Sequence, residues 1–139
     1  MRGRRSTSGG IVMRGTRCLK HWSRVQSVVA LSSAEAELHA GVRTAGEVLS
    51  VQALAEDFGM RLRAKVLMDA NAAIAIMTKE GLSKIRHVET KWFWTQEALR
   101  RERFVLEKVG TKDNLADVFT KRLDAKTAED LLGSAGFRC

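Results

Sequence analysis

Proline, low-complexity linkers and internal repeats are all absent from this chain of 139 residues. Because such features often separate domains, their absence predicts one folded unit over residues 1–139. Hydrophobic residues make up 45% of the chain and charged residues 29%, proportions that are typical of folded domains and argue against disorder of the whole chain. We expect the polar opening segment, residues 1–8, to be flexible.

Cysteine is scarce, and long apolar runs are missing. Cys18 and Cys139 lie far apart, and no C-x-x-C motif or Cys/His cluster accompanies them. The sequence therefore suggests neither a zinc site nor a disulfide framework, and it favours a reducing, intracellular setting in the cytoplasm or nucleus. Neither an apolar signal-peptide core nor a run of about 18 apolar residues occurs, so we expect neither secretion nor membrane insertion.

Acidic residues are absent from residues 1–34, although the whole chain carries 16 of them. This segment holds seven of the basic residues behind the formal net charge of +8, so the remainder is nearly balanced. A segment whose charged residues are all basic is typical of a phosphate-contacting surface, but it is equally compatible with a solvated basic arm. Besides Arg2, the candidates for nucleic-acid binding are Arg4, Arg5, Arg14, Arg17, Lys20 and Arg24.

The first half of the chain predicts a hairpin followed by a long helix. Apolar runs at 11–13 and 18–22 flank a turn-like segment and favour two antiparallel strands. Ser32 and Glu35 have the spacing of a capping box, which predicts a helix from Ser32 to about residue 58. A short apolar strand over 64–68 then ends at Asp69.

The second half alternates helices and strands. The patterns predict helices over 71–78 and 88–100, a strand over 104–109, a helix capped by Asp113 or Asn114 that reaches Leu123, and a helix over 127–132. On the helix over 88–100, the spacing predicts Trp92 and Phe93 in the core and Trp94 at the surface. The element order is typical of an α/β fold, with a mixed sheet covered by helices on both faces.

Three acidic residues are predicted at junctions between elements: Glu37 early in the long helix, Asp69 at a strand end, and Asp117 early in the helix after the last strand. Carboxylates that lie together repel one another unless a cation joins them, and hard oxygen ligands suit Mg²⁺ or Mn²⁺. Two such ions about 4 Å apart can activate water for phosphodiester cleavage. Each residue also has a simpler interpretation: Glu37 could favour the helix dipole, Asp69 could cap the next helix, and Asp117 could pair with Lys121.

Five segments, in this order, resemble the C-terminal ribonuclease H region of copia-type retrotransposon Pol polyproteins: RRSTSGGIVM, VVALSSAEAELHA, MDANAAIAI, IRHVETKWFWTQE and LADVFTKRL. The resemblance implies a ribonuclease H-like fold and hydrolysis of RNA in RNA–DNA hybrids by two divalent ions, Mg²⁺ or Mn²⁺. Position by position, the implied catalytic metal ligands are Glu37 of SSAEAEL, Asp69 of MDAN and Asp117 of LADVFTK. The implied partners are the hybrid and the upstream reverse transcriptase domain of the same polyprotein.

One departure from the family concerns the first strand. In the family, a strand of pattern D-x-D-x-x-G lies just upstream of the RRSTSGG segment, and its Asp bridges the two metal ions. Met1 falls within that connection, so we expect an incomplete domain that lacks the first, central strand of its sheet, with the two halves of the sheet no longer joined. Our first hypothesis is an impaired nuclease, and our second is a catalytically dead remnant that at most binds nucleic acid. A small basic structural protein unrelated to transposons would leave the five segments unexplained.

Overall fold

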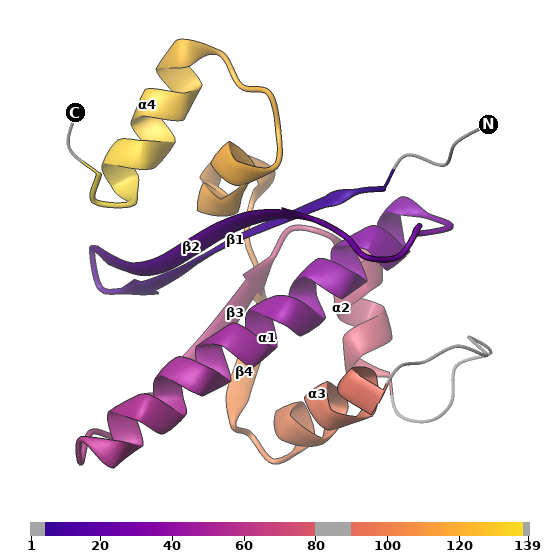
Figure 1. The fold of residues 1–139 in the computed structure, drawn as a ribbon, viewed down its shortest axis with the longest axis vertical. Helices are drawn as coiled ribbons and strands as arrows, with labels where there is room; N and C mark the ends of the chain where they lie inside the picture. The colour runs from indigo at the N-terminus through magenta and orange to yellow at the C-terminus, as the bar shows by residue number, and fades with distance from the viewer. Residues whose placement is uncertain (1–4, 80–89, 138–139) are drawn as a thin grey trace.

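The computed structural model describes residues 5–79 and 90–137, and Figure 1 shows their arrangement. A hairpin and a long helix come first, and shorter helices and strands follow. In chain order the elements are β1 (Thr7–Arg14), β2 (Arg17–Val25), α1 (Ser33–Asp57), β3 (Ala64–Met68), α2 (Asn71–Thr78), α3 (Thr90–Arg100), β4 (Phe104–Lys108), the 3₁₀ turns η1 (Thr111–Asp113) and η2 (Leu115–Phe119), and α4 (Ala125–Ser134). None of these described helices is both long and apolar enough to cross a membrane.

The predicted hairpin is confirmed, and it is longer than the apolar runs suggested. β1 and β2 pair antiparallel from Thr7 opposite Val25 to Arg14 opposite Arg17. Gly15 lies in the turn with φ +60°, a left-handed conformation that glycine adopts without steric cost. The strand begins at Thr7, inside the segment that we expected to be flexible.

The long helix α1 follows its predicted caps closely. The Ser32 hydroxyl accepts a hydrogen bond from the Glu35 amide at 3.1 Å, and the Glu35 carboxylate accepts one from the Leu31 amide at 2.6 Å. The first bond satisfies an amide that the first helical turn leaves without a partner, and the second fixes the residue just before the N-cap. The helix ends just before Gly59, whose φ is +76°. Figure 1 shows α1 running diagonally across the strands.

The main core lies between α1, α2, α3 and the parallel pair β3–β4, which align from Ala64 opposite Phe104 to Met68 opposite Lys108. Helices flank the sheets as predicted, yet the β3–β4 pair is covered on one face only. Alternation along the strands buries Val66 and leaves Leu67 half exposed, and Val105 on β4 is also half exposed. The expectation of helices on both faces therefore fails at this pair. The core side chains come from all five elements and include Leu38, Leu49, Val66, Met68, Met77, Trp92 and Phe104.

The structure contains two separate sheets among the described residues, β1–β2 and β3–β4. A groove of about 500 Å³ separates them, lined by residues 9–14 of β1 on one side and residues 64–68 of β3 on the other. Part of α1 also lines the groove. This mixed α/β arrangement is compatible with a ribonuclease H-like fold that lacks a strand, as the sequence predicted.

The segment after β4 differs most from expectation. Instead of a helix reaching Leu123, the chain forms the short 3₁₀ turn η2, which ends at Phe119. Asn114 caps this turn by accepting a hydrogen bond from the Ala116 amide at 3.2 Å. Asp124 then caps α4 by accepting a bond from the Thr127 amide, so the predicted helix over 127–132 lies within α4. The predicted start of α3 at Val88 lies outside the described residues, as do Arg4 and Cys139.

Candidate active site

The three predicted acidic residues lie on the same side of the fold. Asp69 directly follows β3, Glu37 lies in the second turn of α1, and Asp117 lies within η2. The Lys121 ammonium connects two of them, because its Nζ lies 2.7 Å from Asp117 Oδ2 and 3.9 Å from Asp69 Oδ2. Glu37 and Asp69 both line the groove between the sheets. The acidic site, defined as Glu37, Asp69 and Asp117, therefore adjoins this groove.

Asp117 is the most deeply placed member of the acidic site, with 6% of its surface exposed. Its Oδ1 accepts a hydrogen bond from the Asn114 amide group at 3.1 Å, and its Oδ2 accepts one from Lys121. Both oxygens thus have protein partners, as a buried carboxylate requires. The sequence indicates Asn114 only as a helix cap, and the structure gives it this second role.

The hairpin holds η2 in place beside the site. The Ser23 hydroxyl donates a hydrogen bond of 2.6 Å to the Phe119 carbonyl, and the His21 ring stacks on the Phe119 ring with centroids 5.0 Å apart. Gly9 permits this close approach, because a Cβ there would lie 2.8 Å from Phe119 Cβ. The backbone turn that carries Asp117 is therefore fixed by contacts from a distant part of the chain.

Electrostatic coupling joins the three carboxylates. Desolvation by neighbouring protein atoms raises the pKa of Glu37, even though its side chain reaches the surface, and the negative charges of Asp69 and Asp117 add to this rise. Lys121 acts in the opposite direction. Its own pKa is raised, first by the hydrogen bond to Asp117 and further by the other two carboxylates, so its ammonium stays charged at neutral pH.

The structure discriminates between the simpler interpretations of these residues. Asp117 does pair with Lys121 at the expected i,i+4 spacing. Asp69 does not cap α2, since the cap residue is Ala70 and no side chain bonds to the helix start. Glu37 lies beyond the first turn of α1, where Glu35 is the acidic residue. A dipole interaction therefore explains Glu37 poorly, because the effect falls off within the first turn.

As the side chains lie, the acidic site does not form a metal chelate. Its hard oxygen donors suit Mg²⁺ or Mn²⁺ in chemistry. However, within residues 5–79 and 90–137 no three His, Cys, Asp or Glu side chains gather closely enough to hold an ion. The positive charge beside Asp69 and Asp117 is instead the Lys121 ammonium. The arrangement therefore fits a metal centre in donor type but not in geometry.

The structure describes five of the predicted basic residues, and all five are exposed; four lie on the hairpin strands, and Arg5 lies just before β1. Lys20 forms an ion pair with Glu47 of α1, so part of its charge is neutralised within the fold. A cation that sequence analysis missed, Arg43, lies over the Trp22 ring at 5.9 Å from its centroid. The exposed positions are Arg5, Arg14, Arg17, Lys20 and Arg24.

The aromatic run on α3 was predicted in part. Trp92 is buried as expected, and Trp94 is 49% exposed, as a surface candidate for stacking should be. Phe93 is 47% exposed, so the prediction that it lies in the core is wrong. The face of α3 that packs inward instead carries Trp92, Thr95 and Ala98.

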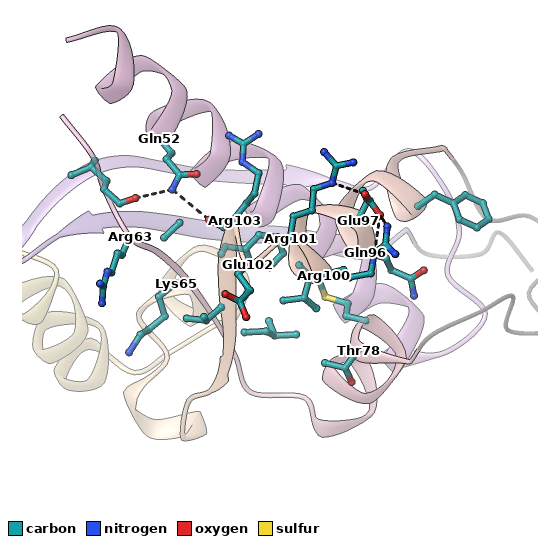
Figure 2. Close-up of a pocket in the computed structure, with 18 of the residues that line it drawn as sticks. Gln52, Arg63, Lys65, Thr78, Gln96, Glu97, Arg100, Arg101, Glu102 and Arg103 are labelled. Atoms are coloured by element: carbon teal, nitrogen blue, oxygen red, sulfur yellow. Dashed lines mark hydrogen bonds and ion pairs between the residues drawn. The ribbon is translucent and has the colours of Figure 1, made fainter. Parts of the chain in front are cut away.

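A large cavity, of about 1740 Å³, contains none of the acidic-site residues. Figure 2 shows it at the other end of the strands, where Gln52 Nε2 donates to the Leu62 carbonyl at 2.7 Å and Arg101 pairs with Glu97. Arg63 and Arg103 also line it. Its size alone would suggest a binding site, but the predicted acidic site lies at the opposite end of β3.

The fold and site together define an α/β protein with a carboxylate cluster at a strand end. The chain is similar to stretches of retrovirus-related Pol polyproteins from plant transposons. It is 24% identical over 120 residues to that of transposon TNT 1-94 from Nicotiana tabacum, covering 85% of this chain. It is 26% identical over 134 residues to that of transposon RE1 from Arabidopsis thaliana, covering 94% of this chain. The chain spans 9% of the length of each of these relatives. No family model and no solved structure matches it.

Proposed function

We propose that this chain is the ribonuclease H segment of a copia-type retrotransposon Pol polyprotein, acting on the RNA strand of RNA–DNA hybrids with Mg²⁺ or Mn²⁺. The observation that carries the proposal is the approach of Asp69 and Asp117 to one ammonium, with Glu37 coupled to both, at the edge of the groove. The similarity to transposon Pol polyproteins supports the same origin.

The groove between the sheets supports the interpretation that a strand is missing and that the enzyme is therefore impaired. β1 and β3 each pair on one side only among the described residues, and their other edges border the groove. We propose that a strand of pattern D-x-D-x-x-G from the preceding part of the polyprotein would lie there and supply a fourth carboxylate. Its backbone would also give partners to donors and acceptors on both edges.

The contribution of this chain's own residues follows from their positions. Glu37, Asp69 and Asp117 would provide oxygen ligands, and the exposed arginines of the hairpin would hold the nucleic-acid backbone. Arg14 is the best placed of these, because it also lines the groove that reaches the acidic site. Hydrolysis of this type requires no covalent intermediate, and no nucleophilic side chain is assigned.

The test compares hybrid cleavage by the 139-residue chain with cleavage by the chain extended at its N-terminus with the D-x-D-x-x-G strand. We expect Mn²⁺-dependent cutting from the extended chain, little or none from the short one, and loss of cutting in extended Asp69→Asn. Extended Asp130→Asn, which changes an exposed carboxylate on α4, is the matched control and should cut normally. No cutting by the extended chain would contradict the proposal.

The alternative is a non-catalytic remnant that binds nucleic acid through the hairpin. Two observations favour it: no three potential metal ligands gather closely among the residues that the structure describes, and Lys121 neutralises part of the negative charge of the acidic site. It predicts hybrid binding that weakens steeply with salt, with a log–log slope of roughly −0.9 per phosphate contacted, and no cutting by either chain. Substituting Arg14 and Arg17 with alanine should lower the magnitude of that slope by about two if both contact phosphates.

A further inference from the structure

Phe93 is a large aromatic side chain that the fold leaves half exposed to water. It lies on α3 and lines the cavity of about 1740 Å³ at the end of β3 that is remote from the acidic site. Trp94, the next residue, is exposed to a similar extent but lines a different groove, against β2 and α1. The two neighbouring aromatic side chains therefore belong to two different surfaces of the molecule.

The cavity that Phe93 lines is positively charged. Among the described residues, six cationic and three acidic side chains line it. Glu97 pairs with both Arg100 and Arg101, and their hydrogen bonds lower its pKa. Three other cations of the lining have no acidic partner among the described residues: Arg63, Lys79 and Arg103. Like charges on one surface repel one another, and an anion bound there would relieve this repulsion.

Gln52 brings two of these unpaired cations together. Its Nε2 donates to the Leu62 carbonyl at 2.7 Å and to the Arg103 carbonyl at 3.4 Å, as the dashed lines in Figure 2 show. Arg63 directly follows Leu62, so the two arginines directly precede the paired strands β3 and β4. Neighbouring strands are about 4.8 Å apart, and two guanidinium groups at adjacent strand ends can hold phosphate oxygens through several N–H donors.

Gln96 fixes the third unpaired cation against α3. Its Nε2 donates to the Lys79 carbonyl at 2.8 Å, which joins the end of α2 to α3. Gln96 lies about one turn after Phe93, and Arg100 lies about one turn further. The helix from Phe93 to Arg100 spans about 10 Å, which is the length of about three nucleotide steps. An aromatic ring and several cations therefore line one surface along α3.

We propose that this cavity binds single-stranded nucleic acid, with a base stacked on Phe93 and the phosphates held by the surrounding cations. Proteins that bind single strands combine a positively charged groove with aromatic side chains on which bases stack. A duplex would leave Phe93 unused, because its base faces are covered by neighbouring bases. An acidic protein segment would match the charge but would offer the ring no base. The inference does not depend on the acidic site, which lies at the opposite end of β3.

The test measures binding of fluorescent oligothymidylate and oligouridylate to the 139-residue chain in EDTA, by anisotropy. Phe93→Leu should bind about tenfold more weakly, because it removes one stacked base. Weakening with either probe supports the proposal, and the probe that shows it identifies the preferred sugar. Trp94→Leu is the matched comparison and should bind as the wild type does. An RNA–DNA hybrid should bind equally well to Phe93→Leu and to the wild type.

The role of the cations is tested by salt dependence. Arg63→Gln combined with Arg103→Gln should reduce the magnitude of the log–log slope by about 1.4, since each phosphate contact on a single strand contributes about 0.7. Arg122→Gln combined with Lys126→Gln removes the same charge from exposed positions outside the cavity and should leave the slope unchanged. Equal reductions in both double variants would overturn the proposal, because net charge alone would then explain them.

A crosslinking measurement on the wild-type chain does not depend on the folding of any variant. Ultraviolet irradiation with an oligonucleotide that contains iodouracil should attach the probe at Phe93, as peptide mass spectrometry would show. Crosslinks confined to the hairpin or to Trp94 would overturn the proposal, as would wild-type affinity in a folded Phe93→Leu. Polyglutamate binding that weakens equally in Phe93→Leu would overturn it in favour of an acidic protein partner. These outcomes leave the proposed function intact, because that function is tested by metal-dependent cutting.

Discussion

The Ser23 hydroxyl donates a hydrogen bond of 2.6 Å to the carbonyl oxygen of Phe119, 96 residues further along the chain. This hydrogen bond connects the hairpin directly to the turn η2, which carries Asp117. The stacking of His21 on Phe119 lies beside it. The position of Asp117 therefore depends on a strand that contains no acidic residue and takes no part in the site itself.

Removing this hydrogen bond should destabilise the turn η2. We expect Ser23→Ala to lower the free energy of unfolding by about 1 kcal/mol, the usual net value of one hydrogen bond. The amides of Thr120 and Lys121, which bond to the Asp117 carbonyl, should exchange faster with solvent. Urea denaturation and amide exchange measure the two effects. Ser27→Ala serves as the control at an exposed serine, and an equal loss there would contradict this explanation.

Two glycines of α1 should respond differently to alanine. A Cβ at Gly46 meets nothing within 4 Å. Gly46→Ala should therefore stabilise the protein by about 0.5–1 kcal/mol, because alanine loses less backbone entropy on folding and has a higher helix propensity. A Cβ at Gly41 would lie 2.6 Å from Met68 Cε. In Gly41→Ala, overpacking should cost about 1 kcal/mol or more and cancel the stabilisation expected from alanine. Thermal unfolding of both variants decides the point, and equal stabilisation would show that Met68 yields freely.

The cap of α4 should make stability depend on acid pH. Hydrogen bonds from the Thr127 hydroxyl and amide lower the pKa of Asp124. The stabilisation from its charged form is therefore present above the unfolded pKa of about 3.9 and is lost as the pH falls through the lower folded value. Asp124→Asn keeps a capping oxygen that does not titrate. Unfolding measured between pH 2 and pH 7 should depend less on pH in this variant, and an unchanged profile would refute the assignment.

Two neighbours on β4 should differ sharply in their contribution to the core. Phe104 is 1% exposed, and Phe104→Ala should cost about 3–5 kcal/mol, enough to unfold a protein of marginal stability. Val105 points to the uncovered face and is 47% exposed, so Val105→Ala should cost less than about 1 kcal/mol. Circular dichroism and urea titration provide the comparison. Similar losses at both positions would mean that the far face is covered in solution.

The parts of the fold that local chemistry controls were predictable. The N-cap at Ser32 and the stop signal at Gly59 located α1, and the short apolar run located β3 with Asp69 at its end. The turn η2 was not predictable, because the apolar spacing after Asn114 also fits a longer helix. Packing against Gly9 and Ser23 holds this turn, and no local pattern encodes such contacts.

The acidic site was likewise predictable only where its contacts are local in the sequence. Spacing indicated that Lys121 could reach Asp117, four residues earlier. Its approach to Asp69, 52 residues away, depends on how η2 and β3 are placed by the fold. The three carboxylates could thus be named from the sequence together with the family resemblance, whereas the cation between two of them could not.

The separation of the two sheets has a consequence for the dynamics of the backbone. Alternate amides of β1 point away from β2, and within the described part of the chain no strand pairs with them on that side. Their deuterium uptake should be rapid while the amides bonded to β2 are slow, which would give the strand a sawtooth pattern of protection. Any polypeptide that came to lie beside β1 would erase the sawtooth, so uptake along this one strand would report directly on its neighbour.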